Sequence, residues 1–179
     1  MKNWSGGVLA LLMLMLSWPC WAEPSQRELE DIQAWEAAHL AAEQAIPALL
    51  ERYGNAIGCA FAFNPGNVVK YRIQKQPVFV AVISLDVGCS GGTSMSRNVL
   101  VTMKYGDYHR ISVDPERSRP SLTPTDFPKR LERLYVENGE ILFSGFKPDW
   151  TKDALCCATQ PVKGKVSFSD GGWQVVFQP

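Results

Sequence analysis

The sequence predicts an α+β protein in which an N-terminal amphipathic helix packs on an antiparallel β-sheet and disulfide bonds staple the fold. Three observations lead to this class. A helical pattern of apolar residues lies near the start of the 179-residue chain. Short strand-like runs separated by turn signals follow it, without the alternating helices that a parallel sheet requires. Four cysteines remain once a leader is removed, an even number that favours two disulfide bonds in an oxidising compartment.

Residues 1–22 have the pattern of a secretory signal peptide. One lysine precedes an apolar run at residues 8–16, which is too short to cross a bilayer, and Ala22 supplies a small residue for cleavage. Cys20 raises the alternative of a lipoprotein, but the residues before it are too bulky for the usual lipidation signal. We therefore expect cleavage after Ala22 and a single α+β domain, residues 23–179, that is periplasmic or secreted.

The charge balance argues against two classes of partner. Without the leader the chain has 17 basic and 18 acidic residues, so it offers no electrostatic basis for binding nucleic acid or an anionic membrane. No later stretch of the sequence is long and apolar enough to cross a bilayer. We expect a protein partner, no nucleic acid, no membrane insertion after signal cleavage and no cofactor.

A helix is expected to begin at Ser25, because Ser25 and Glu28 have the spacing of a capping box. Pro47 should kink this helix or start a second one, and Gly54 gives the expected stop signal. Mostly apolar residues recur at steps of three and four, as on one face of a helix: Leu29, Ile32, Trp35, His39, Ala42, Ile46, Leu49 and Tyr53.

The remaining chain has the alternation and turn residues of β-strands. Residues 64–67 should form a turn, and Asn138-Gly139 is the strongest hairpin signal in the sequence. The run at residues 78–86 is apolar enough to be a central strand. Strands are expected at residues 57–63, 68–73, 78–86, 97–105, 108–113, 131–137, 140–146, 165–169 and 173–177.

The disulfide prediction concerns Cys59, Cys89, Cys156 and Cys157. Adjacent Cα atoms are about 3.8 Å apart, below the roughly 4.4–6.8 Å that disulfides span without strain, so Cys156 and Cys157 should not pair with each other. We therefore expect Cys59 and Cys89 each to pair with one of the two adjacent cysteines, in an order that the sequence leaves open. The alternative is a Cys59–Cys89 bond together with a vicinal bridge.

The last 27 or so residues carry a resemblance to a known group of proteins. Asp153-Ala-Leu-Cys156-Cys157, followed by strand-like residues and Gly171-Gly-Trp173, resembles poorly characterised secreted bacterial proteins that include the LppP/LprE-like lipoproteins. In those proteins an Asp-x-x-Cys-Cys-Pro-Ser segment precedes a terminal strand pair that carries an aromatic residue, and Ala158-Thr159 stands here in place of Pro-Ser. The resemblance implies an exported bacterial domain without assigned catalysis.

One motif raises the question of serine catalysis. Ser90 lies in Gly-Cys-Ser-Gly-Gly, which matches Gly-x-Ser-x-Gly after a strand, but the residues that follow lead into another strand and not into a helix. His109 is the one downstream histidine, and Asp107 is too close to it in sequence to orient its ring easily. The sequence therefore favours a glycine-rich turn that positions Cys89.

Other catalytic and metal-binding patterns have no support at the level of sequence. His39 and His109 lack ligand spacing with each other and with the cysteines, so no metal site is expected. A carboxylate pair for glycoside hydrolysis stays open, with no reason to prefer any two of Asp86, Asp114, Glu132 and Glu140.

The segment at residues 114–128 is the candidate binding region. Its four prolines restrict the unbound chain, so docking would lose less conformational entropy than docking of a flexible loop, although a plain surface loop is the competing interpretation. Arg117 and Arg119 offer planar contacts to carboxylates, and Leu122 and Phe127 offer apolar anchors.

The expected function is that of a non-enzymatic periplasmic binding protein, an inhibitor or immunity-type protein acting on another macromolecule. The alternative is a small cell-envelope hydrolase that uses Ser90 or a carboxylate pair. A structural subunit of the envelope is a third interpretation.

Overall fold

The computed structural model describes residues 25–86, 88–89, 96–153, 157–169 and 171–178. The predicted signal peptide and its cleavage site lie outside these residues. Contacts between residues divide the chain after Trp35, and the described part of the first unit, residues 25–35, is the beginning of a helix. The second unit holds the rest of that helix and all other elements, so the fold is described from this unit.

The N-terminal helix is bent, as the sequence predicts. Helix α1 (Gln26–Gln44) ends one residue before Ala45. Helix α2 (Ile46–Ile57) begins one residue after it, with Pro47 in its first turn. The capping box is present: the Glu28 carboxylate accepts a hydrogen bond from the Ser25 amide at 2.7 Å, and the Ser25 hydroxyl accepts one from the Glu28 amide at 3.3 Å. The bond from the Ser25 amide, and next the bond that the Ser25 hydroxyl donates to the carboxylate, lower the pKa of Glu28.

Gly54 does not end the helix, contrary to the prediction. Helix α2 continues to Ile57, and Gly54 is buried inside it. A Cβ atom at this position would overlap the ring of Phe61 on the first strand. Glycine is therefore needed so that this strand can pack closely against the helix, and not to end the helix in a left-handed conformation.

The first sheet has the order β1-β2-β3-β4 and is antiparallel throughout. The expected turn at residues 64–67 is instead a bulge inside one long strand, because the pairing of β1 with β2 resumes at Val68 after a shift of register. The expected strand at 108–113 is confined to its last three residues. The strands are β1 (Ala60–Ile73), β2 (Gln76–Asp86), β3 (Arg97–Tyr105) and β4 (Ile111–Val113).

The second sheet has the order β5-β6-β7-β8 and is also antiparallel. Asn138 and Gly139 join its first two strands with φ angles of 51° and 77°, the left-handed pair that an Asn-Gly hairpin turn requires. The strands are β5 (Arg130–Glu137), β6 (Glu140–Lys147), β7 (Gln160–Ser169) and β8 (Gly172–Gln178).

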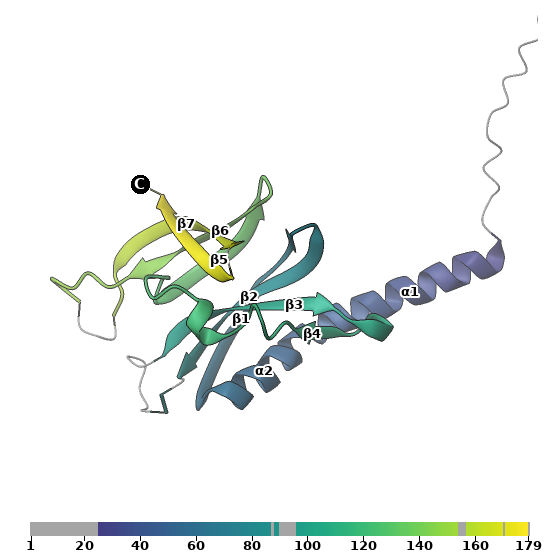
Figure 1. The fold of residues 1–179 in the computed structure, drawn as a ribbon, viewed down its shortest axis with the longest axis horizontal. Helices are drawn as coiled ribbons and strands as arrows, with labels where there is room; N and C mark the ends of the chain where they lie inside the picture. The colour runs from purple at the N-terminus through teal and green to yellow at the C-terminus, as the bar shows by residue number, and fades with distance from the viewer. Residues whose placement is uncertain (1–24, 87, 90–95, 154–156, 170, 179) are drawn as a thin grey trace, which may run out of the picture. The chain divides into compact units, whose positions relative to one another are not determined.

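Strand β2 has a hydrophobic core on each of its faces, and this arrangement makes three layers (Figure 1). Phe79, Ala81 and Ile83 face α2, where Ile46 and Leu50 are buried against them. The alternate residues face the second sheet and form the core between the sheets: Val78, Val80, Val82 and Leu100 with Phe127, Leu134, Ile141, Phe143, Val166 and Trp173. The protein is therefore an α+β fold with its bent helix on one antiparallel sheet, and a second sheet covers the opposite face.

The disulfide connectivity preferred from the sequence is wrong. Cys59 and Cys89 are bonded to each other, with their Cα atoms 5.1 Å apart. Cys59, just before β1, donates its amide to the carbonyl oxygen of Asp86 at the end of β2, so the hairpin itself brings the two cysteines together. The preference for long-range pairing left this local pairing out of account, and the Cys59–Cys89 bond belongs to the alternative connectivity that the sequence left open. Cys157 is exposed, and Cys156 lies outside the described residues.

The proline-rich segment at residues 114–128 lies along β3 and does not protrude. The Ser118 hydroxyl accepts a hydrogen bond from the Thr102 amide at 3.0 Å, and the Thr123 hydroxyl accepts one from the Leu100 amide at 2.8 Å. Since β4 pairs with β3 only at residues 103–105, these side chains satisfy backbone groups of β3 that no strand of the described chain reaches. The segment therefore acts as an edge cover for the first sheet.

Candidate functional site

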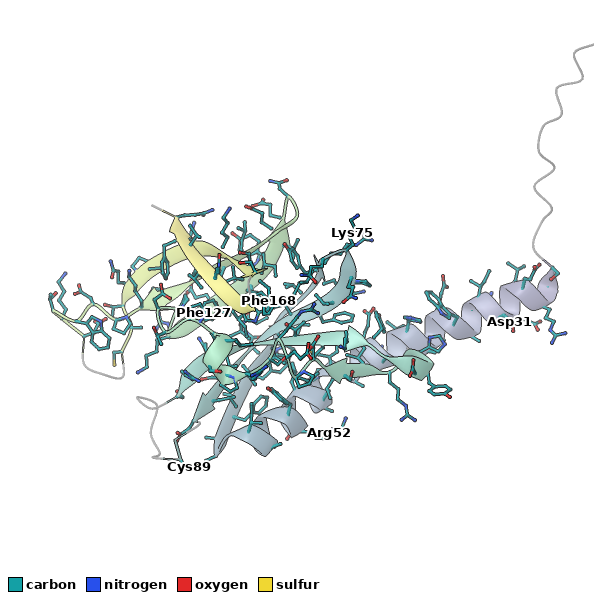
Figure 2. The ribbon with its side chains drawn as sticks, in the orientation of Figure 1. Asp31, Arg52, Lys75, Cys89, Phe127 and Phe168 are labelled. Carbon is teal, nitrogen blue, oxygen red and sulfur yellow. A yellow bond between two sulfur atoms is a disulfide. The ribbon has the colours of Figure 1, made fainter. Side chains whose placement is uncertain are left out.

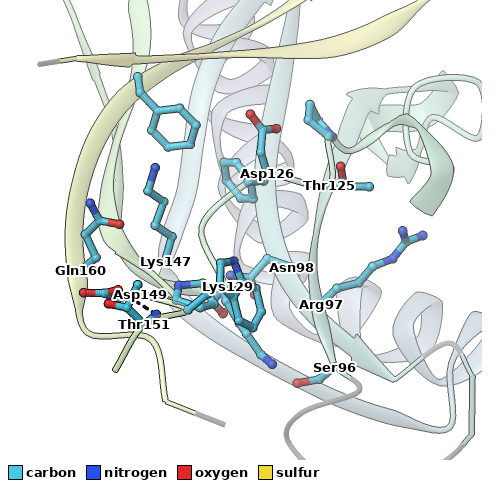
Figure 3. Close-up of a pocket in the computed structure, with 15 residues that line it drawn as sticks. Ser96, Arg97, Asn98, Thr125, Asp126, Lys129, Lys147, Asp149, Thr151 and Gln160 are labelled. Atoms are coloured by element: carbon cyan, nitrogen blue, oxygen red, sulfur yellow. Dashed lines mark hydrogen bonds between the residues drawn. The ribbon is translucent and has the colours of Figure 1, made fainter. Parts of the chain in front are cut away.

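The structure describes a cleft of about 850 Å³. It lies where the start of β3, the end of the proline-rich segment and the ends of strands of the second sheet meet (Figure 3). We name it the inter-sheet cleft and define it by the residues that line it: Ser96, Arg97, Asn98, Pro124, Thr125, Asp126, Phe127, Lys129, Lys147, Pro148, Asp149, Trp150, Thr151, Gln160 and Phe177.

The two walls of the cleft come from different sheets. Figure 3 shows Lys147 and Gln160 on one side and Arg97 and Thr125 on the other. Asn98 fixes the second wall, because its side-chain amide donates to the carbonyl oxygens of Pro128 and Lys129 at 2.8 and 3.2 Å. This pair of bonds ties the end of the proline-rich segment to β3 and so holds this wall of the cleft together.

Aromatic rings form the apolar part of the cleft. Phe127 packs edge-on against Phe143 with ring centroids 5.3 Å apart, and Phe143 packs in the same way against Phe177 at 5.8 Å. The ammonium group of Lys147 lies 5.0 Å from the centroid of Phe177, within the range of a cation–π contact. Trp150 differs from these residues because 71 % of it is exposed. The inner part of the cleft thus consists of rings packed against one another, while its rim presents the large exposed ring of Trp150.

The loop that carries Trp150 is held by two carboxylates. Asp149 accepts hydrogen bonds from the Thr151 hydroxyl and amide at 2.6 and 3.1 Å, and these bonds lower its pKa. Asp153 accepts bonds from the amide of Asp149 at 2.8 Å and of Thr159 at 2.9 Å, and its pKa is also lowered. Both carboxylates are therefore ionised at neutral pH and serve to fix the loop.

The predicted partner-binding residues are placed unequally by the structure. Arg117 bonds the buried Asp114 carboxylate at 3.2 Å, and its guanidinium lies 5.7 Å from the ring centroid of Phe168. Arg119 is exposed. Leu122 packs against the core between the sheets, and Phe127, only 7 % exposed, belongs to that core (Figure 2). Phe127 also lines the inter-sheet cleft, so it connects the predicted segment to the cleft.

The catalytic candidates are not brought together into a recognisable site. Ser90 lies outside the described residues. His109 packs against His39 with ring centroids 4.8 Å apart, a contact between residues that the sequence analysis treats separately. No group of three or more His, Cys, Asp or Glu side chains in the described part of the chain is arranged to hold a metal ion.

The four carboxylates considered for hydrolysis have different neighbours, and none of them lines the inter-sheet cleft. Asp114 pairs with Lys104 as well as with Arg117, and Glu140 pairs with Lys165 on the neighbouring strand at 2.8 Å. The Asp86 carboxylate accepts a hydrogen bond from the amide of Gly88, beside the disulfide. Glu132 is exposed at the bulge of β5. The two carboxylates that share a hollow, Asp126 and Asp149, are not among these four.

The sequence analysis missed most residues of the inter-sheet cleft. The cleft is assembled from six separate segments, and no single stretch of sequence carries a pattern for it. One signal was present in the sequence: Trp150 lies in a polar turn, where a large aromatic residue has no core to fill. An exposed tryptophan in such a turn is a reason to look for a binding surface.

Among the described helices, none is both long and apolar enough to cross a membrane. Comparisons of the chain with protein-family models, with curated proteins and with solved structures found no match.

Proposed function

We propose that this protein is an exported, non-enzymatic binding protein that binds a protein partner through the inter-sheet cleft. The exposed ring of Trp150 beside the cleft is the observation that carries the proposal. Tryptophan and arginine are the residues most often found at the energetic centres of protein interfaces, where a ring enters a pocket of the partner or completes one. An inhibitor or immunity-type role is the form of binding that this proposal favours.

The charges of the cleft indicate the chemistry of the partner. Three basic side chains, Arg97, Lys129 and Lys147, line the cleft with two acidic ones, of which Asp149 is engaged by Thr151 and Lys152. An acidic side chain on a protruding segment of the partner would meet these cations, while an adjacent apolar residue would contact Trp150 and Phe177. We therefore propose a partner that inserts a loop with an acidic and an apolar residue.

The export of the protein belongs to the same proposal. The Cys59–Cys89 bond supports it, because disulfide bonds form and persist in oxidising compartments such as the periplasm. The leader pattern of residues 1–22 is the second support. Mass spectrometry of the exported form should find Glu23 as its first residue.

A second candidate function rests on Asp126 and Asp149, which both line the cleft and are a possible carboxylate pair for hydrolysis of a glycan. The hydrogen bonds that lower the pKa of Asp149 oppose it as the general acid, because a carboxyl group in that role needs a raised pKa. Binding is therefore the function that the geometry favours.

The experiment compares the tagged mature protein with the double variant Trp150→Ala/Lys147→Glu as bait in extracts of the cell envelope. We expect one protein in stoichiometric amount with the wild type, and at least tenfold less of it with the variant. The matched control is Val136→Ala/Lys75→Glu, which changes an exposed apolar residue and an exposed lysine outside the cleft. The control should capture the partner normally.

All three proteins should have closely similar thermal midpoints, because Trp150, Val136 and Lys75 are exposed and Lys147 is only half-buried at the cleft. Equal capture by the double variant, or no stoichiometric partner of the wild type, contradicts the proposal. Asp126→Asn then tests the second candidate function. Glycan hydrolysis by the purified wild type that is lost in this variant would identify an enzyme.

A further inference from the structure

A second hollow, of about 460 Å³, lies between the bent helix and the turn that joins β3 to β4. It is separate from the inter-sheet cleft, with which it shares no lining residue. We call it the arginine hollow. Its lining consists of Ala38, Ala42, Ala45, Leu49, Arg52, Tyr108, His109, Arg110 and Ile111.

The floor of the arginine hollow is made of small and apolar side chains on one face of the bent helix. Ala38, Ala42 and Ala45 follow one another at steps of four and three, the spacing of a single helical face, and Leu49 continues it into α2. Because alanine ends at Cβ, this face leaves space where longer side chains would fill the gap beneath the turn. The hollow is therefore encoded by the three alanines.

The walls of the hollow are positively charged. Arg52 comes from α2, and Arg110 follows the 3₁₀ turn η1 (Asp107–His109). No acidic side chain of the described chain lines the hollow, and no ion pair between described residues involves either arginine. Two guanidinium groups thus share one concave surface without a carboxylate to neutralise them.

Glu43, the acidic residue that follows Ala42 on α1, is paired elsewhere. Glu43 accepts a hydrogen bond from the Tyr105 hydroxyl at 2.7 Å and forms an ion pair with Lys70 at 2.8 Å. The Lys70 contact first, and then the Tyr105 bond, lower the pKa of Glu43. Burial first, and then the bond to Glu43, raise the pKa of Tyr105 to about 12. Glu43 is therefore committed to the side of the helix that faces β1 and β3.

The turn that carries Arg110 is fixed in an unusual conformation. Tyr108 and His109 both have φ angles of 57°, in the left-handed region that side chains with a Cβ rarely adopt. The His109 ring packs against His39, which in turn packs against Tyr105 at 4.7 Å. Such strain persists only where the surroundings hold it, and here the ring contact of His109 with His39 does so for the second of these residues. The turn thus presents His109 and Arg110 to the hollow together.

We propose that the arginine hollow binds a phosphate group. Guanidinium groups offer pairs of parallel N–H donors that match the oxygens of a phosphate, and two of them balance the two negative charges of a phosphomonoester near neutral pH. A carboxylate has one charge and two oxygens, so it would leave one guanidinium without a partner.

The phosphate group has two possible sources with the same chemistry, a free phosphate or phosphomonoester and the headgroup of a lipid. The exposed ring of Tyr108, 89 % of which is accessible, stands at the mouth of the hollow and would contact whatever the phosphate is attached to. The arginine hollow needs no contribution from the inter-sheet cleft, so a failure of one proposal would not count against the other.

Isothermal titration calorimetry of the mature protein at low ionic strength tests the proposal, with inorganic phosphate and acetate as probes. We expect one phosphate per chain, and acetate should bind at least tenfold more weakly. Arg52→Gln/Arg110→Gln should weaken phosphate binding at least tenfold. The control Arg27→Gln/Arg72→Gln removes the same charge from two exposed arginines outside the hollow and should bind phosphate as the wild type does. Arg52→Lys/Arg110→Lys keeps the charge, removes the paired donors and should give an intermediate affinity.

Flotation with vesicles that contain phosphatidic acid distinguishes the sources. Binding to vesicles without measurable binding of inorganic phosphate, lost in the Arg52→Gln/Arg110→Gln variant, identifies a lipid headgroup as the ligand. The proposal is overturned if phosphate and vesicles both fail to bind, if the two glutamine double variants weaken binding equally, or if acetate binds as tightly as phosphate. A circular dichroism spectrum identical to that of the wild type shows that the variants are folded.

Discussion

At the scale of single residues, two neighbouring hydroxyl groups have opposite roles. The Ser118 hydroxyl donates to the Thr102 carbonyl and accepts from the Thr102 amide, both at 3.0 Å, and so replaces a strand at that point of β3. The hydroxyl of Thr102 itself is buried and has no hydrogen-bond partner among the described residues. The first group supports the sheet, whereas the second is a polar atom removed from water without compensation.

Thr102→Val should therefore raise the free energy of unfolding by about 1 kcal/mol, because valine has a similar shape and no hydroxyl to bury. Urea denaturation followed by circular dichroism measures the change. Thr125→Val, at an exposed position, is the matched control and should have almost no effect. A loss of stability in Thr102→Val would mean that this hydroxyl has a partner after all.

Ser118→Ala should lower the free energy of unfolding by about 1–3 kcal/mol, since it leaves a buried backbone amide of β3 without an acceptor. The exposed Ser121, in the same segment, gives the control Ser121→Ala, for which the expected change is within about 0.5 kcal/mol. Hydrogen exchange of the Thr102 amide supplies a local readout, because it should accelerate in Ser118→Ala alone. Unchanged exchange would show that the segment does not protect β3.

At the scale of elements, the loop between β6 and β7 depends on Asp153. Its pKa is lowered chiefly by the bond from the Asp149 amide and next by the bonds from Thr159. A carboxyl group whose pKa is lower in the folded state stabilises the fold above its unfolded pKa, about 3.9, and this contribution is lost as the pH falls through the folded value. The loop that presents Trp150 should hence loosen in acid.

An NMR titration of the Thr159 amide should show an inflection below pH ~3.9 in the wild type. Asp153→Asn, which cannot ionise, should lack this inflection and show the loosened amide signal at neutral pH as well. The control Asp126→Asn, in the inter-sheet cleft but outside this loop, should leave the Thr159 titration unchanged. An inflection above pH ~3.9 in the wild type would contradict the assignment of the bonds.

Elements governed by local signals were predictable from the sequence. The bounds of β3 agree with the prediction, and so does the Asn138-Gly139 turn, because alternation and left-handed turn residues act over a few neighbours. The bulge in β1 was missed, since its Asn-Pro-Gly-Asn sequence is equally typical of a turn and only the pairing with β2 decides between them. The role of Gly54 likewise depends on Phe61, which a helical pattern does not contain.

The candidate sites were much less predictable than the elements. The contact between His39 and His109 joins residues far apart in the sequence, and both hollows are lined by side chains from several elements. Their composition depends on which strand ends meet, and hydrophobic periodicity does not determine this. Among the predicted partner-binding residues, only Phe127 lines the inter-sheet cleft.

At the scale of the whole molecule, the two sheets share one core and are also tied along their edges. Phe143 is fully buried in the core between the sheets and contacts the rings of Phe127 and Phe177. Asn67, in the bulge of β1, accepts a hydrogen bond from the Leu134 amide of β5 at 3.1 Å, so the bulge that the sequence analysis missed joins the sheets. If the two sheets separated, each would expose the apolar face that it now buries against the other.

Phe143→Ala should consequently lower the free energy of unfolding by about 3–5 kcal/mol, and both sheets should still unfold in a single transition. Circular dichroism reports on all strands, and in a Trp35→Phe/Trp150→Phe background the fluorescence of Trp173 reports on the second sheet, so the two urea curves should coincide. Val176→Ala, at an exposed position of β8, is the control and should cost little. Two separated transitions in the wild type would show that the sheets are independent units.

The bond between Cys59 and Cys89 has a consequence for the order in which the molecule is assembled. Both cysteines precede all strands of the second sheet, and the bond closes around the β1–β2 hairpin alone. It can therefore form when only the first half of the chain, up to Cys89, is available, and no later residue is needed for it. The second sheet then forms on a hairpin that the disulfide bond has already closed. When the cysteines between β6 and β7 become available, Cys59 and Cys89 are already bonded and cannot pair with them.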